Sequence, residues 1–424
     1  MVSWKRLTQS ALLTAGLTAC SENAMQPRTP VDAQLQAGGL QAQGYVLTPA
    51  GWFHSSCVHE IPAGARVSVD NVVTRRDGSR YQIPRCAFRA HLTLPHFQGG
   101  RAVPADTGWV EDAYASAPQG DAYRSLNATW TVPSAPTHTF QYPEVYFTFP
   151  GIWNNAFILQ PVLQYGYSKA GPPGYWPPSW GLASWHCDGR SSVCDHSSLI
   201  SASVHDAIYG EVSASACQGG LCTWTVTTVD LTKGTRTILT KTDYDNYFSA
   251  TGGAVETHSG FNSCSYFPSA GVFFTNIALS GRSGALTPDW GKAVPQNPSP
   301  SCGFDVKFTT TTVSDIHNPP PPLVTGATTN PSPAVQYQPF SLTLTGSGFD
   351  PAVVQIVYTL NCDPPSPSCE AEVIPNSGIS SKTETQLVVS QMTFGTAGTL
   401  YVHARNGDTG PLSGYQTVTI RPLY

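Results

Sequence analysis

Short strand-like segments fill the chain between residues 120 and 285, with turns recurring at intervals of roughly ten residues. Segments such as "SLNATWTVP", "FILQPVLQYG" and "CTWTVTTVDLT" are each bounded by Gly, Pro, Asn or Ser. None of them has the spacing of an amphipathic helix. Strands of this kind bury their apolar residues by pairing into two packed sheets. The sequence therefore predicts an all-β fold built on an antiparallel double β-sandwich.

The composition argues against a nucleic-acid partner and favours an exported protein. The 424 residues carry a net charge of −5, so a nucleic-acid partner is not expected. Charged residues make up only 12% of the chain and aromatic residues 11%. Together with abundant Gly, Pro, Ser and Thr, this balance is typical of exported β-rich proteins.

The N-terminus has the features of an export signal. Lys5 and Arg6 precede a short apolar stretch that ends in "LTAC" at Cys20. This pattern resembles a bacterial lipoprotein signal, in which Cys20 is lipidated; an ordinary cleaved signal peptide is the alternative. No later stretch reaches the roughly 18 apolar residues of a membrane span. We therefore expect a protein of the bacterial cell envelope or the extracellular space that contacts a membrane only through the lipid on Cys20.

Ten further cysteines remain, and an even number in an exported chain predicts disulfides. Most of them lie close together in sequence. The expected pairs are Cys57–Cys86, Cys187–Cys194, Cys217–Cys222, Cys264–Cys302 and Cys362–Cys369.

Shifts in composition divide the chain. A flexible tether is expected after the signal, because that stretch is polar and has no periodicity. The Cys57–Cys86 region fits either a small module or a propeptide. The run "NPPPP" is a stiff spacer. The predicted regions are a signal (1–20), a tether (21–44), the module or propeptide (45–110), the central β-sandwich (111–317), the proline-rich linker (318–322) and a C-terminal domain (323–424).

The C-terminal domain alternates apolar and polar residues in about seven short strands, which predicts an immunoglobulin-like sandwich. Through "LTLTGSGFD", "GTAGTLYVHARNGD" and "TVTI" it resembles IPT/TIG domains. The resemblance implies a spacer or an adhesive appendage.

Three polar residues in the central region stand inside apolar strands. Glu256 lies in "TGGAVETHSGF", and a carboxyl on a partly apolar strand suits general acid/base chemistry; a solvent-facing Glu256 is the alternative. Gln160 and Gln164 lie in "FILQPVLQYG", where a buried amide must find partners. Gln160 beside a carboxyl could stabilise an oxyanion, or it is a satisfied structural amide. Pro161 makes a bulge plausible, which would turn Gln164 to the other face.

Several aromatic side chains could bind a substrate. "GYWPPSWGLASWHC" brings four of them together. On a groove they would form a stacking platform, and buried they would pack the core. The candidate substrate-binding residues are Trp130, Gln164, Tyr175, Trp176, Trp180 and Trp185.

The sequence gives no reason to expect a metal or another cofactor. His54, His59 and Glu60 match no strong ligand spacing. His186 and His196 flank Cys187 and Cys194, for which a disulfide is favoured over a zinc site.

A family resemblance connects these residues. "LNATWTVP", "FTFPGI", "ILQ", "SLISASVHDAIYGEVSAS", "AVETHSGF" and "GVFFTNIAL" follow one another as do similar motifs of the eqolisins, the glutamic peptidases. The resemblance implies a concanavalin-like double sandwich with a groove. It also implies that Glu256 takes a proton from water and later protonates the leaving amine, while Gln160 polarises the scissile carbonyl. Such a base works best in acid.

The chain also departs from the family pattern. Pro161 and Val162 follow Gln160 where the family has a small residue and glycine, so Gln164, in "QYG", is a rival assignment. The neprosin family, which uses two glutamates, is a further resemblance, with Glu144 or Glu211 as the second carboxylate.

Two functions therefore remain. The first is an exported acid endopeptidase that acts as a monomer on polypeptide substrates. The second is a non-catalytic surface protein that presents its aromatic residues to polysaccharide or protein. They differ in whether Glu256 and Gln160 lie on the same face of a sheet.

Overall fold

The computed structural model describes most of the chain, and every structural statement below concerns those residues. They are 39–92, 96–98, 101–103, 108–136, 145–166, 168, 179–257, 264, 267–268, 271–294, 302–317, 322–351, 354–362, 371–406 and 412–423.

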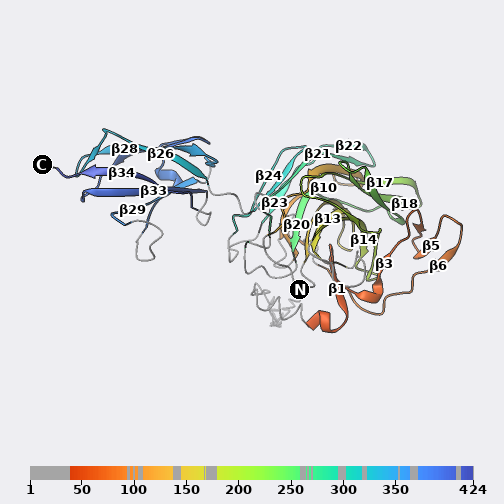
Figure 1. Ribbon diagram of the computed structural model, residues 1–424. Helices are drawn as coiled ribbons and strands as arrows, with labels where there is room; N and C mark the ends of the chain where they lie inside the picture. Colours follow the sequence, from red (N-terminus) through yellow and green to blue (C-terminus); the bar gives the residue numbers. More distant parts are fainter. Residues whose placement is uncertain are drawn as a thin grey trace, which may run out of the picture.

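A nine-stranded sheet forms the inner layer of the central region (Figure 1). Eight strands follow one path and β16 (Ile200–Ser201) pairs with β14 beside it. The order along the path is β23 (Gly291–Ala293), β10 (Gly108–Ser116), β20 (Ser249–Thr257), β12 (Val145–Trp153), β13 (Phe157–Gly166), β14 (Trp180–Asp188), β15 (Val193–His196) and β3 (Val58–Glu60).

An eleven-stranded sheet forms the outer layer. β22 (Gly284–Leu286) pairs with β21 beside the main path. The order along the path is β24 (Asp305–Phe308), β25 (Val313–Ile316), β21 (Val272–Gly281), β11 (Tyr123–Thr131), β17 (Ala207–Gln218), β18 (Leu221–Asp230), β19 (Thr235–Tyr244), β4 (Arg66–Val67), β5 (Val72–Thr74) and β6 (Arg80–Gln82).

The two sheets pack face to face, as the alternation in the sequence predicts. On β18 every second residue is buried, and Trp224 and Val226 point into the core shared by the sheets. The outer face of β18 carries threonines instead. On β13 all ten residues are buried, because the nine-stranded sheet is covered on both faces. The all-β sandwich expected from the sequence is confirmed.

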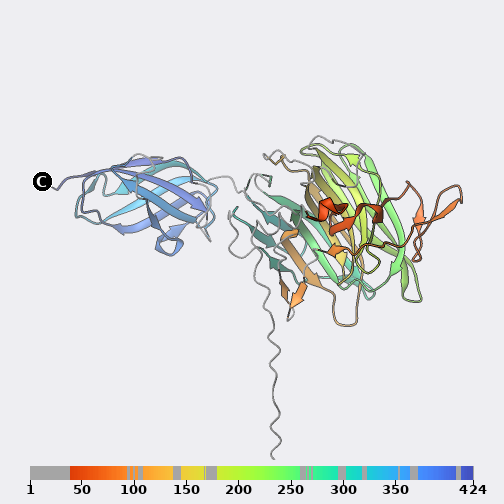
Figure 2. The same ribbon diagram turned by 90° about the horizontal axis from the view of Figure 1, so that it is seen from below.

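The second cover of the nine-stranded sheet comes from the N-terminal segment (residues 39–92). Its hairpin of β1 (Tyr45–Thr48) and β2 (Gly51–His54), extended by β7 (His91–Leu92), forms a three-stranded sheet. A core cluster joins hairpin residues such as Phe53 to Phe147, Phe149 and Val162 of the nine-stranded sheet. Figure 2 shows this segment, in red, lying against that sheet. The region expected as a module or a propeptide thus forms a third layer.

The same segment also lengthens both sheets of the sandwich. β3 pairs in parallel with β15, and β4 pairs with β19. Short helical turns such as η1 (Ser55–Cys57) connect its strands. A two-stranded hairpin of β8 (His96–Gln98) and β9 (Arg101–Val103) precedes β10.

The C-terminal domain is a separate two-sheet sandwich that lies beside the central one (Figures 1 and 2). Sixteen buried apolar residues fill its core, and η3 (Asn376–Gly378) contacts β29. An ion pair of 2.8 Å joins Lys307 of the central region to Asp350. One sheet has the order β26 (Leu323–Asn330), β28 (Phe340–Ser347), β32 (Gln386–Met392), β31 (Ser381–Lys382); the other has the order β27 (Ala334–Val335), β34 (Gln416–Arg421), β33 (Gly398–Asn406), β29 (Val354–Leu360), β30 (Glu372–Ile374).

Four of the five expected disulfides are present. They are Cys57–Cys86, Cys187–Cys194, Cys217–Cys222 and Cys264–Cys302. Cys362 is disulfide-bonded too, whereas Cys369 and the predicted lipidation site Cys20 lie outside the described residues.

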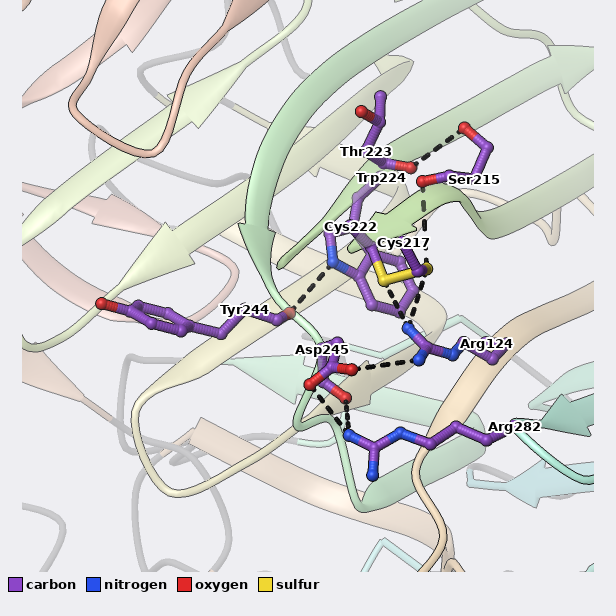
Figure 3. Close-up of a disulfide and its surroundings, with 9 residues drawn as sticks. All are labelled: Arg124, Ser215, Cys217, Cys222, Thr223, Trp224, Tyr244, Asp245 and Arg282. Carbon is purple, nitrogen blue, oxygen red and sulfur yellow. Dashed lines mark hydrogen bonds and ion pairs between the residues drawn. A yellow bond between two sulfur atoms is a disulfide. The ribbon is translucent and has the colours of Figure 1, made fainter. Parts of the chain in front are cut away.

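One disulfide belongs to a charged cluster at the rim of the outer sheet (Figure 3). Arg124 donates to both sulfurs of Cys217–Cys222 and to Asp245, the latter at 3.0 Å. Arg282 donates to the second oxygen of Asp245 at 2.8 Å. The cluster therefore connects the ends of β11, β17, β19 and β21.

No helix in the described part of the chain is long and apolar enough to cross a membrane.

The core between the sheets yields a prediction for Trp224. Its ring is fully buried against Tyr247, and its indole N–H donates to the carbonyl of Tyr244 at 3.1 Å. We expect Trp224→Ala to lower the free energy of unfolding by about 3–5 kcal/mol, measured by urea denaturation, because it leaves a large cavity. The control, Thr225→Ala on the outer face of the same strand, should change it by about 0.5 kcal/mol or less. Equal losses in the two variants would contradict this assignment of faces.

Candidate active site

Glu256 and Gln164 lie in one row across the nine-stranded sheet. Glu256 on β20 pairs with Phe147 on β12, and Phe147 pairs in turn with Gln164 on β13. Residues paired in this way point to the same face of a sheet. Two strand spacings put the Cα atoms of Glu256 and Gln164 about 10 Å apart. The row brings a carboxyl and an amide to one face with a single ring between them.

Gln160 shares this face but lies further along β13. The pairing of β13 with β12 and with β14 keeps one register, without a bulge at Pro161. Gln164 therefore does not turn to the other face, and the bulge considered from the sequence is absent. Four residues separate Gln160 from the row of Glu256, which adds roughly 13 Å along the strand.

A glycine makes room beside Gln160. The register places Gly151 of β12 opposite it, and a Cβ built on Gly151 would lie 3.4 Å from the Gln160 Cβ and 3.0 Å from the carbonyl oxygen of Leu159. Because Gly151 has no side chain, the Gln160 side chain has room to extend away from the sheet.

The N-terminal hairpin closes over this face. Gln160 Nε2 donates a hydrogen bond to the carbonyl of Pro49, in the turn between β1 and β2. Its Oε1 has no hydrogen-bond partner among the described residues. Gln164 Oε1 accepts from the Ser168 hydroxyl at 2.8 Å. Each glutamine of this apolar strand thus has at least one hydrogen-bond partner outside the strand.

Glu256 is completely buried. Its neighbours across the sheet, Trp109 on β10 and Phe147 on β12, belong to the core cluster that includes the N-terminal hairpin. Glu256 therefore does not face solvent on the convex side. It lies in the layer between the nine-stranded sheet and the N-terminal segment.

The described tryptophans of the candidate substrate-binding set are buried. Trp130 and Trp180 belong to the core between the two sheets, and Trp185 belongs to the core under the hairpin. They pack the protein as the structure stands. Tyr175 and Trp176 lie outside the described residues.

The two glutamates considered as a second carboxylate are not on the Glu256 face. Glu211 lies on β17 of the other sheet, and because Val212 next to it points into the core, Glu211 points outward. It cannot act beside Glu256, which corrects that alternative. Glu144 lies outside the described residues.

The histidines considered as metal ligands have separate partners. His54 stacks on Phe88 with 3.5 Å between ring centroids, and Glu60 accepts from the Ser198 hydroxyl at 2.5 Å. His59 lies 3.7 Å from Asp195. His196 packs on Trp185. These side chains do not converge on a common point.

A cluster of buried acids escaped the sequence analysis. Glu111, Asp112 and Asp315 are at most 1% exposed, and His317 Nδ1 lies 2.5 Å from the Glu111 carboxylate. The sequence did contain a signal for these acids, the segment "GWVEDAYAS". Successive residues of a strand point to opposite faces, so when both faces of this strand are covered, both neighbouring acids must be buried.

Burial changes the titration of these groups. It raises the pKa of Glu111 and of Asp315 well above the usual range of carboxyls. It raises the pKa of Asp112 to about 8, an effect that the Thr251 hydroxyl partly opposes. Burial also lowers the pKa of His317 to about 3. Burial therefore favours the uncharged form of all four groups.

A second buried network lies at the other end of the sandwich. Asp195 is paired with Lys241 at 2.6 Å, and Asp243 with His186 at 2.6 Å. Although burial opposes it, the neighbouring side chains of Lys241 and His186 lower the pKa of Asp195 and Asp243 respectively. A cavity of about 740 Å³ opens beside this network, between the N-terminal segment and the sandwich, and Glu256 does not line it.

Comparison with known proteins gives similarities of structure alone. No protein-family model matches the chain, and no curated protein matches its sequence. The structure is similar to scytalidoglutamic peptidase in complex with a peptide-based transition-state analogue, at 19% identity and a TM-score of 0.35, over 50% of this chain and 98% of that one. It is also similar to SCP-B, a member of the eqolisin family of peptidases in complex with the tripeptide Ala-Ile-His, at 18% identity and a TM-score of 0.33, over the same shares of the two chains.

The two networks predict how stability depends on pH. An acid whose folded-state pKa is raised stabilises the fold below about pH 4 and loses that contribution as pH rises, because the unfolded chain gives up its proton first. An acid whose pKa is lowered, such as Asp195, contributes stability above about pH 4 and loses it in stronger acid. The lowered pKa of His317 acts in the opposite direction, because the unfolded chain takes up that proton below about pH 6.5. Since Glu111, Asp112 and Asp315 are all raised and outnumber it, we expect the urea midpoint to be highest near pH 4 and to fall toward pH 8.

Asp315→Asn tests the origin of this slope. It removes one raised group, so the fall in unfolding free energy as pH rises above about 4 should become smaller, by at most about 1.4 kcal/mol per pH unit. A stability that rises steadily from pH 4 to pH 8 would contradict the expectation.

Proposed function

We propose that this chain is the precursor of an exported acid endopeptidase in which Glu256 activates water. The observation that carries the proposal is the row that joins Glu256, Phe147 and Gln164 on one face of the nine-stranded sheet. A carboxyl and an amide on one face are the two groups that the glutamic-peptidase reaction needs. Export is supported by the disulfides, which form in oxidising compartments.

In this proposal Glu256 takes a proton from water, and the water oxygen attacks the carbonyl carbon of a peptide bond. An amide N–H that donates to the carbonyl oxygen stabilises the negative charge that develops there. Gln164 is the first candidate for that donor, because it lies in the row of Glu256. Gln160, further along the strand, is the second candidate and would otherwise bind the backbone of an extended substrate.

The covered state supports a latent precursor. A substrate cannot reach Glu256 in this state, because Glu256 is completely buried, and the N-terminal hairpin covers the same face of the sheet at Gln160. The Pro49 carbonyl accepts the hydrogen bond of Gln160 in the way that a substrate carbonyl would. We assign the segment from residue 45 up to the start of β10 at Gly108 the role of a propeptide, released after cleavage of the chain before β10.

The lipid on Cys20 and the C-terminal sandwich complete the proposal. The lipid would hold the precursor at a bacterial envelope, and cleavage before β10 would also separate the enzyme from that anchor. The C-terminal sandwich would act as a spacer, since its exposed aromatic residues, such as Tyr337, are scattered singly.

The first test is cleavage of a denatured protein by the purified chain across pH 2 to 8, before and after limited proteolysis between β9 and β10. We expect activity confined to acid, only after the nick, and at least about 100-fold lower in Glu256→Gln. Glu211→Gln, on the outer face of the other sheet, is the matched control and should keep wild-type activity. If Glu256→Gln equals the wild type, or if nothing is cleaved at any pH, the non-catalytic binding protein becomes the better account.

The second test separates the two glutamines. Gln164→Met and Gln160→Met keep the length of the side chain and remove the amide. If Gln164 holds the oxyanion, its variant should lose about 100- to 1,000-fold in kcat, and the Gln160 variant should mainly raise KM. The reverse result would make Gln160 the oxyanion donor.

A further inference from the structure

Asp112 is a buried carboxyl that has no role in the mechanism proposed above. It is 1% exposed, and among the described residues its two oxygens have no hydrogen bond of normal geometry, although the Thr251 hydroxyl lies close enough to lower its pKa. Burying an unpaired polar group is costly, and a buried acid with only a structural task is normally paired. Glu111, the neighbouring acid, follows that rule through His317.

A β-bulge decides which of the two acids faces Glu256. Between Trp109 and Glu111 the register of β10 against β20 shifts by one residue, so Val110 is extra. Trp109 pairs with Glu256 and Asp112 pairs with Ala254, which puts Asp112 on the Glu256 face. Glu111 pairs with Val255 and points into the core between the sheets. Bulges of this kind often re-aim a side chain next to an active site.

Asp112 and Glu256 are diagonal neighbours on adjacent strands. Glu256 lies two residues beyond Ala254, the residue opposite Asp112. Such diagonal pairs lie about 7–8 Å apart, within reach of one peptide bond and an attacking water. β23 contributes Ala293 on the other side of Asp112. The titratable groups near Asp112 are Glu256 on β20 and, through its charge, Asp315 on β25.

We propose that Asp112 is a second catalytic carboxyl, the acid that protonates the leaving amine. The inference rests on the proposed function and deepens it. In the family resemblance Glu256 itself would protonate the leaving amine, whereas here Asp112 donates that proton. Glu256 takes one proton from water as the oxygen–carbon bond forms. As the carbon–nitrogen bond breaks, the nitrogen takes the proton of the Asp112 carboxyl. The proton on Glu256 then exchanges through solvent back to Asp112, so the cycle closes without another reactant.

The surroundings of Asp112 suit this task. Burial holds the pKa of Asp112 near 8 in the covered state, so the group keeps its proton in mild acid. When the hairpin leaves and water enters, that pKa falls toward the ordinary value of about 4. Two carboxyls on one face can divide the roles of base and acid between them.

The test compares Asp112→Asn with Glu111→Gln in the nicked full-length chain, using a peptide substrate between pH 2 and 8. Both residues are buried acids of raised pKa, adjacent in sequence, and only the first faces Glu256. We expect Asp112→Asn to lower kcat by about 100-fold or more and to remove the alkaline limb of the kcat profile. Glu111→Gln should stay within about threefold of the wild type under conditions where it is folded.

Urea unfolding of both variants shows whether they are folded. If Asp112→Asn does not fold, Asp112→Glu keeps an acid in place and should shift the alkaline limb. Activity that depends on Glu256 and is unchanged in rate and pH profile by either Asp112 variant overturns this inference alone. An equal loss of kcat in Glu111→Gln also overturns the inference, since both substitutions would then lower activity by disturbing the structure. Activity unaffected by Glu256→Gln overturns both the inference and the proposed function.

Discussion

Coverage of the nine-stranded sheet on both faces is the constraint on which the rest of the structure depends. Every residue of β13 and of β20 is buried, so each polar group on these strands must find a partner, lose its charge or carry a cost. Gln160 finds the Pro49 carbonyl, and Gln164 finds Ser168. Asp112 becomes a weak acid instead. The burial of this face therefore also determines the hydrogen bonding and the protonation of the polar groups on it.

The two buried networks show how the position of an acid decides its charge. Asp195 is buried as deeply as the other acids and Asp243 nearly so, yet Lys241 and His186 lie against them, and their pKa values are lowered. Glu111 and Asp315 have a neutral histidine and each other as neighbours, so burial dominates and the proton stays. Charged pairs thus lie at the end where the N-terminal segment joins both sheets, and neutral acids lie at the end near Glu256. The neutral acids therefore cost least in acid, where the unfolded chain is protonated too, whereas the charged pairs lose their contribution below about pH 4.

Much of the fold could be predicted from the sequence, and the site only in part. Alternating residues and frequent turns gave the all-β sandwich, because strand periodicity is a local property, and close spacing of cysteines gave four disulfides. The choice between Gln160 and Gln164 depends on which β12 residue each faces, and register is set by long-range pairing. Asp112 was missed because a bulge at Val110 determines its face, and one inserted residue leaves no clear mark on a single sequence. The third layer was missed because its strands are too short to show where they pack.

In the proposed precursor, the hydrogen bond between Gln160 and Pro49 would serve both latency and recognition. Pro49 and Ala50 form the two-residue turn of the β1–β2 hairpin, and this turn inserts a backbone carbonyl rather than a side chain against the sheet. A carbonyl is the group that an extended peptide would also present, so the hairpin satisfies the amide with the chemistry of a substrate. The apolar residues around that turn, Leu47 and Phe53, join the core on either side of it and exclude water from the contact. Because the hairpin is also continuous with strands in both sheets and is tied by Cys57–Cys86, opening the face requires more than breaking one hydrogen bond. A reversible lid would need fewer attachments, so this architecture favours release by cleavage of the chain.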